Sequence, residues 1–443
     1  MIILCINSGS SSLKFKLYNN ETQEDLATGI VERIGLASFI KFDCNSGKHK
    51  IEHSCPTHTE AIELTLNTMV NPEYGILKSM DEISAVGHRI VHGGEKVTHS
   101  CLINDKVIAD FKSLYDLSPL HNPANVLGIE AVRSILPNVP HVAILDTAWH
   151  KTMPDYVYTY PLPHEWKEKY GVRKYGFHGT SHLYVSRRAS VLLGKKPSES
   201  RIIVLHIGNG SSANAIKYGK SFDTSMGMTP LEGLMMGTRS GDFDPAISFF
   251  IMEKENLTPA ALYDILNKKS GCLGVTKQFS DRLDIEIAAE KGDELCNLNI
   301  EMESYRLKRY IGSYMAAMGG CDAIVFTAGV GEMGPITREK AVEGMEELGI
   351  KLDRDKNNKL KNRNGEFEIS TPDSKIKIYV IPTDEEAVFI EDVVSIVNGT
   401  YKEPEFFEYS FQKKEYVNKQ RAAAFEEDCI KKPFLKEIAV KPK

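Results

Sequence analysis

NSGSSSLKF (residues 7–15) is a cluster of small residues between two apolar stretches. Residues 2–6 form a β-branched run, and residues 13–18 alternate apolar with basic side chains. Both patterns are typical of strands, so the cluster predicts the turn of a β-hairpin. It is not a P-loop, because no second glycine precedes Lys14 and no helical pattern follows.

The same arrangement recurs in RIIVLHIGNGSSANAIKYG, residues 201–219. At a constant offset Ile6 aligns with Ile207, and Gly9 aligns with Gly210. This repeat favours two similar α/β halves, each presenting backbone N–H groups and hydroxyls that suit an anion such as phosphate. The alternative is that Gly-Ser-Ser is simply a common hairpin turn used twice.

Two further strands lead into glycine or acidic residues. Residues 322–327 form a strand that precedes Gly329-Val330-Gly331, and a helix with an apolar face comes before it and ends at Gly319. Residues 375–381 form another strand, followed by Pro-Thr-Asp-Glu-Glu. Asp384 and the carboxylates after it suit either a helix N-cap or a Mg²⁺ site beside nucleotide phosphates.

Composition excludes several classes of function. A chain of 443 residues is longer than a single hydrophobic core usually supports, so we expect more than one domain. With 54 basic and 60 acidic residues the chain lacks the excess of positive charge that is typical of nucleic-acid-binding proteins. No apolar run has the length of a membrane span, and no signal sequence is recognisable. The eight cysteines contain no C-x-x-C pair, so we expect a cytoplasmic protein with buried thiols.

Five polar clusters set single charged or histidine side chains among small and apolar residues. They are GHRIVHGGE (87–95), LSPLHNPAN (117–125), AILDTAWHKTMP (143–154), KYGFHGTSH (174–182) and MTPLEGLMMGTRSGDFDP (228–245). Buried charge requires a partner, which favours a shared anionic or metal site over separate ion pairs or caps. His178 and His182 lack the glutamate of a zinc motif, so zinc is rejected.

This set of residues suits phosphoryl transfer. The reaction needs positive charge around the phosphoryl oxygens, a metal ion and alignment of the attacking and leaving oxygens. A sugar or alcohol acceptor also needs a base. A carboxylate acceptor does not, because with a pKa of about 4 it is already ionised at pH 7.

Taken in order, these motifs resemble the acetate kinase (acetokinase) family, within the superfamily of sugar kinases, Hsp70 and actin. The resemblance covers roughly residues 1–400, and FHGTSH and PLEGLMMGTRSGD are its most specific parts. It implies an α/β fold with two duplicated actin-like (ribonuclease H-like) domains flanking an active-site cleft. The first would comprise residues 1–150 and 386–400 and the second 151–385, followed by an extension of unknown role, residues 401–443.

The resemblance also implies the site residues. Mg²⁺, with Mn²⁺ as an alternative, would be bound by Asn7 and Glu385. The catalytic residues would be Arg89, His121, Asp146, His178 and Arg239, and Arg89 would also bind the acetate carboxylate. Val91, Leu120, Phe177 and Pro230 would form the methyl pocket. ATP or ADP would contact Ser10, Ser12, Lys14, His206, Ile207, Gly208, Asn209, Gly210, Asp281, Arg282, Leu283, Gly329, Val330, Gly331, Glu332 and Met333.

Two departures concern the nucleotide. Arg282 stands one residue before the arginine of the family pattern, whose place Leu283 takes, and Met333 replaces an asparagine.

The expected reaction is Mg²⁺-dependent in-line transfer from ATP to acetate by a homodimer. A propionate or butyrate kinase and a non-catalytic nucleotide clamp of the actin or Hsp70 type are the alternatives; neither nucleic acid nor a membrane is expected as a partner.

Overall fold

The computed structural model describes residues 1–9, 11–119 and 121–442, which form two compact units. Unit 1 comprises Met1–Ala148 and Glu385–Phe407, and unit 2 comprises Trp149–Asp384 and the residues from Glu408 onward. Each unit is built on one mixed sheet covered by helices, so the expected α/β class is confirmed. The chain crosses between the units after Ala148, after Asp384 and after Phe407.

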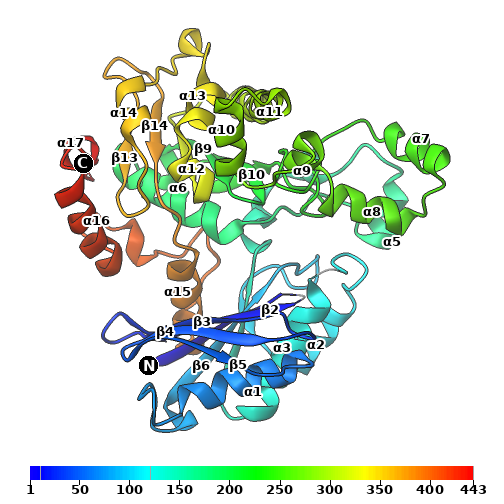
Figure 1. Ribbon diagram of the computed structural model, residues 1–443, viewed down its shortest axis with the longest axis vertical. Helices are drawn as coiled ribbons and strands as arrows, with labels where there is room; N and C mark the ends of the chain where they lie inside the picture. The colour runs from blue at the N-terminus through cyan, green and yellow to red at the C-terminus, as the bar shows by residue number, and fades with distance from the viewer. Residues whose placement is uncertain (10, 120, 443) are drawn as a thin grey trace. The chain divides into compact units, whose positions relative to one another are not determined.

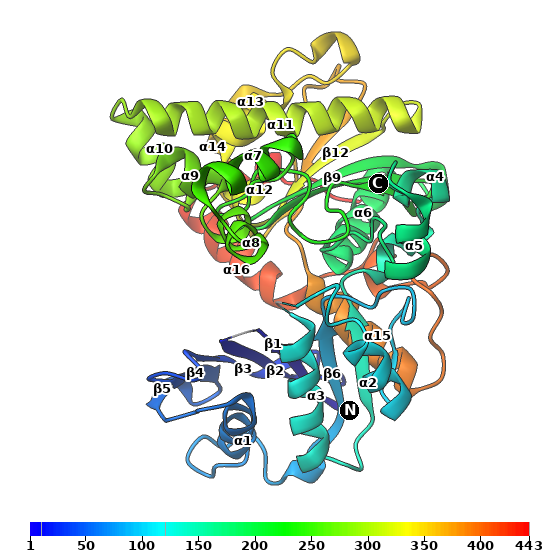
Figure 2. The ribbon, with the colours of Figure 1, turned by 90° about the vertical axis from the view of Figure 1, so that its right-hand side faces the viewer.

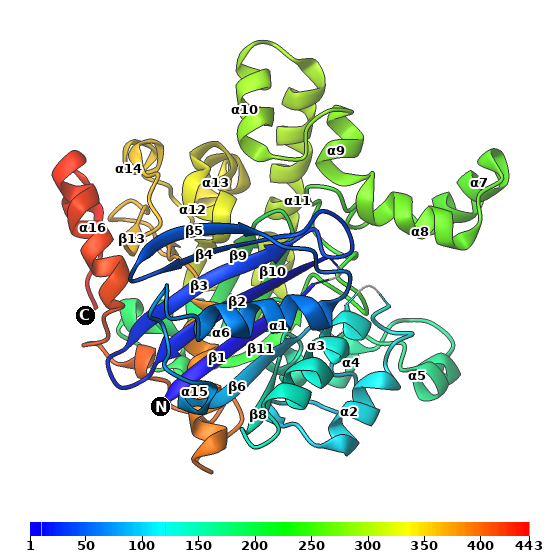
Figure 3. The ribbon, with the colours of Figure 1, turned by 60° about the horizontal axis from the view of Figure 1, so that its bottom comes forward.

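The sheet of unit 1 contains the first predicted hairpin. Its strand order is β5 (Gly47–Glu52), β4 (Phe39–Cys44), β3 (Glu24–Glu32), β2 (Ser12–Asn19), β1 (Ile2–Ser8), β6 (Ile83–Ile90), β8 (His141–Leu145) and β7 (Cys101–Leu102), as Figure 3 shows in part. β1 and β2 pair antiparallel with Asn7 opposite Lys14. β1, β6 and β8 run parallel, so their carboxyl ends lie at the same edge of the sheet.

Helices cover both faces of this sheet because side chains alternate along β1. Leu4 and Ile6 pack in a cluster with α1 (His58–Met69) and α3 (Asn122–Ile135). Ile3 packs instead with Ile390 and Val393 of α15 (Glu385–Val397), a helix that begins where the acidic segment predicted one. α2 (Asp105–Lys112) packs beside α3, and η1 (Met80–Glu82) precedes β6.

The sheet of unit 2 repeats that of unit 1. Its order is β11 (Lys220–Thr224), β10 (Ser211–Lys217), β9 (Arg201–Ile207), β12 (Ala323–Thr327), β14 (Lys377–Val380) and β13 (Phe367–Glu368). The first five match β3-β2-β1-β6-β8 in order and in direction, with antiparallel pairs first and parallel pairs after them. The duplication predicted from the two Gly-Ser-Ser turns is therefore confirmed.

Two long helices enclose this second sheet (Figure 2). α6 (Gly179–Leu193) packs on β9 and β12, and α11 (Glu294–Met318) packs on Ile203 and Leu205 of β9. α11 ends at Gly319, whose φ of 74° is left-handed, as the sequence predicted. The other helices are η2 (Ala148–Thr152), α4 (Asp155–Tyr158), α5 (His164–Tyr170), η3 (Pro197–Glu199), α7 (Ala246–Glu255), α8 (Pro259–Lys268), α9 (Gly271–Thr276), α10 (Arg282–Glu290), α12 (Ala328–Met333), α13 (Pro335–Val342), η4 (Glu346–Leu348), α14 (Arg354–Lys359), η5 (Ser410–Gln412), α16 (Lys419–Lys431) and α17 (Leu435–Ile438). Among the described residues no helix is both long and apolar enough to cross a membrane.

Candidate active site

Unit 1 pairs Arg89 with Asp146 at the carboxyl ends of β6 and β8. Arg89 donates from Nε to Oδ1 of Asp146 at 2.9 Å and from Nη2 to Oδ2 at 2.7 Å. The carboxylate is almost fully buried, whereas a third of the arginine side chain is exposed. Asp146, and to a smaller extent Glu385, raise the pKa of Arg89. The bidentate pair fixes the plane of the guanidinium, whose Nη1 has no acceptor among the described residues.

A buried amide joins the first hairpin turn to the segment after β6. Asn125 of α3 donates from Nδ2 to the carbonyl of Ser8 at 2.8 Å, and its Oδ1 accepts from the N–H of Val91 at 3.1 Å. Within the turn, the N–H of Gly9 donates to the carbonyl of Ser12 at 2.8 Å. Asn125 therefore fixes the turn relative to Val91, a role that no motif in the sequence indicated.

The predicted metal ligands both belong to unit 1. Asn7 lies half-buried near the end of β1, and Glu385 is the first residue of α15. Across the described residues, no group of three or more His, Cys, Asp or Glu side chains is arranged to hold a metal. One carboxylate and one amide are hard oxygen donors that fit Mg²⁺, which keeps several waters or substrate oxygens in its shell. They do not fit zinc.

The remaining predicted residues of unit 1 divide by their exposure. Lys14 is exposed on β2, while Ser12 and Val91 are half-buried. His121 is half-buried and occupies the N-cap position of α3. Ser10 and Leu120 lie outside the described residues.

In unit 2 three histidines gather around Ser212. The Oγ of Ser212 lies 2.9 Å from Nδ1 of His178 and 2.7 Å from Nε2 of His182. The ring of His178 stacks on that of His206, with centroids 4.1 Å apart. Burial lowers the pKa of His182 well below its ordinary value, so this imidazole is neutral. The two histidines that matched half a zinc motif share a serine hydroxyl.

Arg239 lies against the second glycine turn. A Cβ atom on Gly210 would lie 3.4 Å from Nη1 of Arg239 and 3.7 Å from Nε2 of His178. Among the described residues Arg239 has no carboxylate partner, and its acceptors are the Pro230 carbonyl and the Met236 sulfur. Burial lowers its pKa. A desolvated cation without a counter-ion, beside backbone N–H groups, is a prepared site for an anion.

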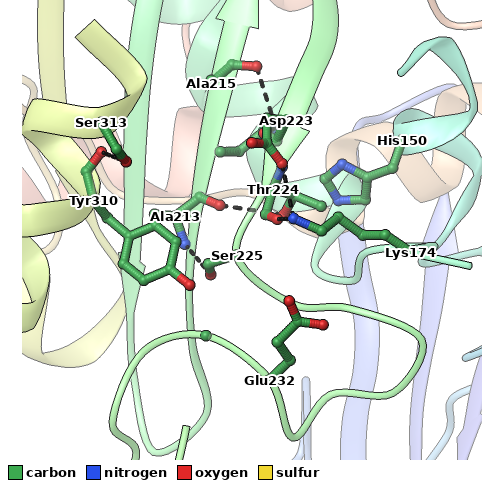
Figure 4. Close-up of polar contacts among 12 residues, drawn as sticks. His150, Lys174, Ala213, Ala215, Asp223, Thr224, Ser225, Glu232, Tyr310 and Ser313 are labelled. Carbon is green, nitrogen blue, oxygen red and sulfur yellow. Dashed lines mark hydrogen bonds and ion pairs between the residues drawn. The ribbon is translucent and has the colours of Figure 1, made fainter. Parts of the chain in front are cut away.

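The loop that carries Pro230 and Arg239 is anchored at two acidic residues. Glu232 accepts a short hydrogen bond from the hydroxyl of Tyr160, and burial raises the pKa of this carboxyl. Asp242 accepts from the N–H of Gly233 at 2.7 Å and from the hydroxyl of Tyr310 on α11 at 2.6 Å. Figure 4 shows Glu232 and Tyr310 on either side of the end of β11, where Lys174 donates to Asp223.

The residues at the start of α10 do not match the prediction for Arg282. Its side chain is turned into the core, where it forms a buried ion pair with Glu303 and contacts Cys272. Asp281 caps the helix by accepting from the N–H of Leu283 at 2.9 Å, and Leu283 is 61% exposed. The guanidinium that we expected to contact the nucleotide is therefore paired with Glu303 inside unit 2. This agrees with the one-residue shift of Arg282 relative to the family pattern.

The glycines after β12 begin a helix, α12. Gly331 and Glu332 are buried, and Gly329, Val330 and Met333 are half-buried. Arg338, which is fully buried, donates from Nη1 to the carbonyls of Gly331 and Glu332, both at 3.0 Å. Burial lowers its pKa to about 9. Arg338 also donates from Nε to Oδ1 of Asn357 at 2.8 Å. It therefore fixes the end of α12, a role that no motif in the sequence indicated.

The remaining predicted residues of unit 2 also divide by exposure. Phe177 and Ile207 are buried. Gly208 and Pro230 are half-buried, and Asn209 is exposed.

The chain is similar to known proteins over most of its length. The model of the acetokinase family matches residues 2–391. Acetate kinase of Geobacter sulfurreducens is 57% identical over 421 residues, covering 95% of this chain and 100% of the relative. That of Thermotoga maritima is 55% identical over 399 residues, covering 90% and 99%. The crystal structure of Porphyromonas gingivalis acetate kinase superposes with a TM-score of 0.85 at 48% identity, covering 89% of this chain and 99% of that one. A propionate kinase from Francisella tularensis gives 0.82 at 38% identity, covering 89% and 99%.

Proposed function

The chain belongs to the acetokinase family and its reaction is phosphoryl transfer between ATP and acetate, and we propose that this transfer is direct, in line and Mg²⁺-dependent. The observation that supports this most strongly is Arg239, which lies half-buried beside Gly210 and His178 with no carboxylate partner among the described residues. A transferring phosphoryl group would supply the missing negative charge.

In this proposal unit 2 binds the nucleotide and the group in flight. Arg239 and His178 stabilise charge on the phosphoryl oxygens, and His121 is proposed for the same role. The phosphates of ATP contact the turn N–H groups, and the adenosine lies near α12. The proposed nucleotide contacts are Ser10, Ser12, Lys14, His206, Ile207, Gly208, Asn209, Gly210, Asp281, Leu283, Gly329, Val330, Gly331, Glu332 and Met333. Arg282 is omitted because its guanidinium already forms a buried ion pair with Glu303.

Arg89 would bind the carboxylate of the acceptor. Arg89 directs Nη1 to the acetate carboxylate, and Asp146 holds the guanidinium in the required plane. No general base is needed, because acetate is ionised at neutral pH. The methyl group would contact Val91, Leu120, Phe177 and Pro230.

Asn7 and Glu385 are the proposed ligands of Mg²⁺, or of Mn²⁺ in its place. When bound, the ion would neutralise charge on the β- and γ-phosphate oxygens of ATP. The oxygen-donor chemistry of the two side chains supports this assignment.

Acetate is the proposed substrate in preference to a longer acid. One methylene group in an apolar pocket changes discrimination by only ~1–3 kcal/mol, so propionate should be turned over more slowly but not excluded. The ratio of kcat/KM for acetate, propionate and butyrate checks this, and a preference for propionate would overturn the choice.

We further propose a cytoplasmic homodimer. All eight cysteines are free thiols, which suits a reducing compartment. Helix α7 has no buried residue and exposes Phe249 and Phe250, an apolar surface that suits contact with a second copy. Light scattering coupled to gel filtration would give the mass, and a monomer at micromolar concentration would contradict the proposal.

Trapping of acetyl phosphate by hydroxylamine tests the activity itself. Purified protein with ATP, Mg²⁺ and acetate should yield acetyl hydroxamate, and omission of Mg²⁺ should abolish it. Folded protein that produces none would remove the proposed function.

A further inference from the structure

The chain from Glu408 onward lies beyond the family match and packs on unit 2. Tyr409 and Phe411 are completely buried, and the ring of Phe411 packs on that of Tyr184 in α6, with centroids 4.8 Å apart. Arg188, also on α6, donates from Nη1 to the carbonyl of Phe411 at 2.9 Å and forms a bidentate pair with Glu366. The start of this segment therefore packs along the helix that begins at His178.

The end of the segment completes the core at the edge of the second sheet. Phe425 of α16 packs on Phe367 of β13, and Ala439 forms a β-bridge with the same residue. Asp428 accepts hydrogen bonds from Asn362 and Asn364, both at 2.8 Å. Figures 1 and 3 show α16, in red, beside β13 and α14. Contacts at both ends hold α16 in one position.

Between these ends, the first turn of α16 binds the loop from Ile381 to Asp384. Arg421 donates from Nη1 to the carbonyl of Pro382 at 3.0 Å and from Nη2 to that of Thr383. Asn418 donates from Nδ2 to the carboxylate of Asp384 at 2.7 Å and caps α16 through Oδ1. A charged donor or acceptor strengthens each of these bonds, and Arg421 makes two of the three.

The same loop reaches the phosphate-binding hairpin through hydroxyl groups. The hydroxyl of Thr383 donates to Oγ of Ser181 at 2.7 Å, and Ser181 lies 2.8 Å from Nδ1 of His206. Because Ser181 accepts from Thr383, its own proton is directed to His206. Nδ1 is then the acceptor, and Nε2 carries the hydrogen. This tautomer presents a donor from His206, as a phosphate ligand requires.

We propose that the C-terminal segment from Glu408 onward is a positioning element of the nucleotide site, acting through Arg421 and Thr383 on the tautomer and orientation of His206. This inference rests on the proposed role of His206 as a phosphate contact. Arg421 and Thr383 are positioning residues, because they act on the nucleotide only through other side chains.

The test compares matched variants by their binding of Mg-ADP and their kinetics. Arg421→Ala should raise the Kd for Mg-ADP, measured by titration calorimetry, and the KM for ATP, each by about tenfold. This is the loss expected when one charge-assisted hydrogen bond, that of His206 to a phosphate, is lost. KM for acetate should not change, because Arg421 and Thr383 bond to none of the residues proposed to bind acetate. Lys431→Ala, an exposed basic residue of the same helix, is the control and should leave both constants unchanged.

A second pair of variants separates positioning from folding. Thr383→Val removes the hydroxyl that orients Ser181 and should reproduce the nucleotide defect, whereas Thr383→Ser keeps the hydroxyl and should not. If Arg421→Ala does not fold, this pair decides the question. Equal Kd for Mg-ADP in the valine and serine variants, or in the Arg421 and Lys431 variants, overturns the proposal. A fall in kcat alone, at unchanged KM for both substrates, would indicate only a lower active fraction and also overturns it. Wild-type protein that binds Mg-ADP but forms no acetyl phosphate would contradict the proposed function instead.

Discussion

The guanidinium of Arg239 faces Gly210 across the space that a single methyl group on that glycine would fill, 3.4 Å from Nη1. His178 borders the same space at 3.7 Å. A phosphoryl oxygen in this position would meet both side chains.

Gly210→Ala should inactivate the enzyme without unfolding it. Gly210 does not have a positive φ, so alanine fits the backbone and should leave the thermal midpoint unchanged or slightly higher. The methyl group would displace the phosphoryl group, and a displacement of about 1 Å can cost about 10²-fold in rate. Steady-state kinetics check this against Gly312→Ala, whose Cβ would meet nothing within 4 Å. Activity near that of the control would remove Gly210 from the site.

Arg239→Ala should lower kcat by at least about 10²-fold while stability is kept. The loss is that expected for a group that stabilises charge in the transition state. Among the described residues the Arg239 side chain pairs with no carboxylate, so its removal leaves no buried carboxylate unpaired. The free energy of unfolding, measured in urea, should therefore not fall. Turnover close to normal would contradict this role.

Arg282→Ala should give the opposite result. The ion pair of Arg282 with Glu303 is buried on both sides, and removing one partner leaves an uncompensated charge that costs about 3–5 kcal/mol of stability. At a temperature where the variant is folded, KM for ATP should equal that of the wild type. A raised KM for ATP at an unchanged free energy of unfolding would instead indicate that Arg282 contacts the nucleotide.

Glu232→Gln should make stability less dependent on pH. Burial raises the pKa of Glu232 above its ordinary 4.5, so the folded protein holds this proton more tightly than the unfolded chain. Wild-type stability therefore falls as pH rises from about 4.5 through the raised value, and this contribution is absent from the variant. Urea unfolding at pH 4.5 and pH 7 should show the variant gaining stability relative to wild type at the higher pH. A constant difference would contradict the assignment.

Local patterns in the sequence predicted the parts of the fold that depend on neighbouring residues. Alternation around the two Gly-Ser-Ser turns predicted both hairpins, and Gly319 marked the end of α11. The resemblance to a family pointed to Arg239 and His178, which the structure brings together at Gly210. The proposed roles of these residues await the experiments above.

Contacts between distant residues were not predictable in this way. Asn125 and Arg338 bond to atoms of other segments, and these partners become known only from the fold. LSPLHNPAN marked Asn125 as part of a polar cluster, but not its contact with Ser8. The docking of the C-terminal segment depends on contacts such as Arg188 with Phe411, which are distant in sequence. The shift of Arg282 by one residue already changed the expected direction of its side chain, because one residue in a helix corresponds to about 100°. Its partner Glu303 could not be predicted, because the two residues are 21 positions apart in the sequence.

The place of α15 in unit 1 has a consequence for synthesis on the ribosome. Ile390 and Val393 complete the apolar layer that Ile3 and Val142 begin, so the chain must continue for more than 200 residues beyond Ala148 before this layer can close. At ~5–20 residues per second the delay is roughly 10–50 seconds. During translation, one face of the first sheet is thus without its helix while most of unit 2 is being made, and this is when nascent chains would need a chaperone.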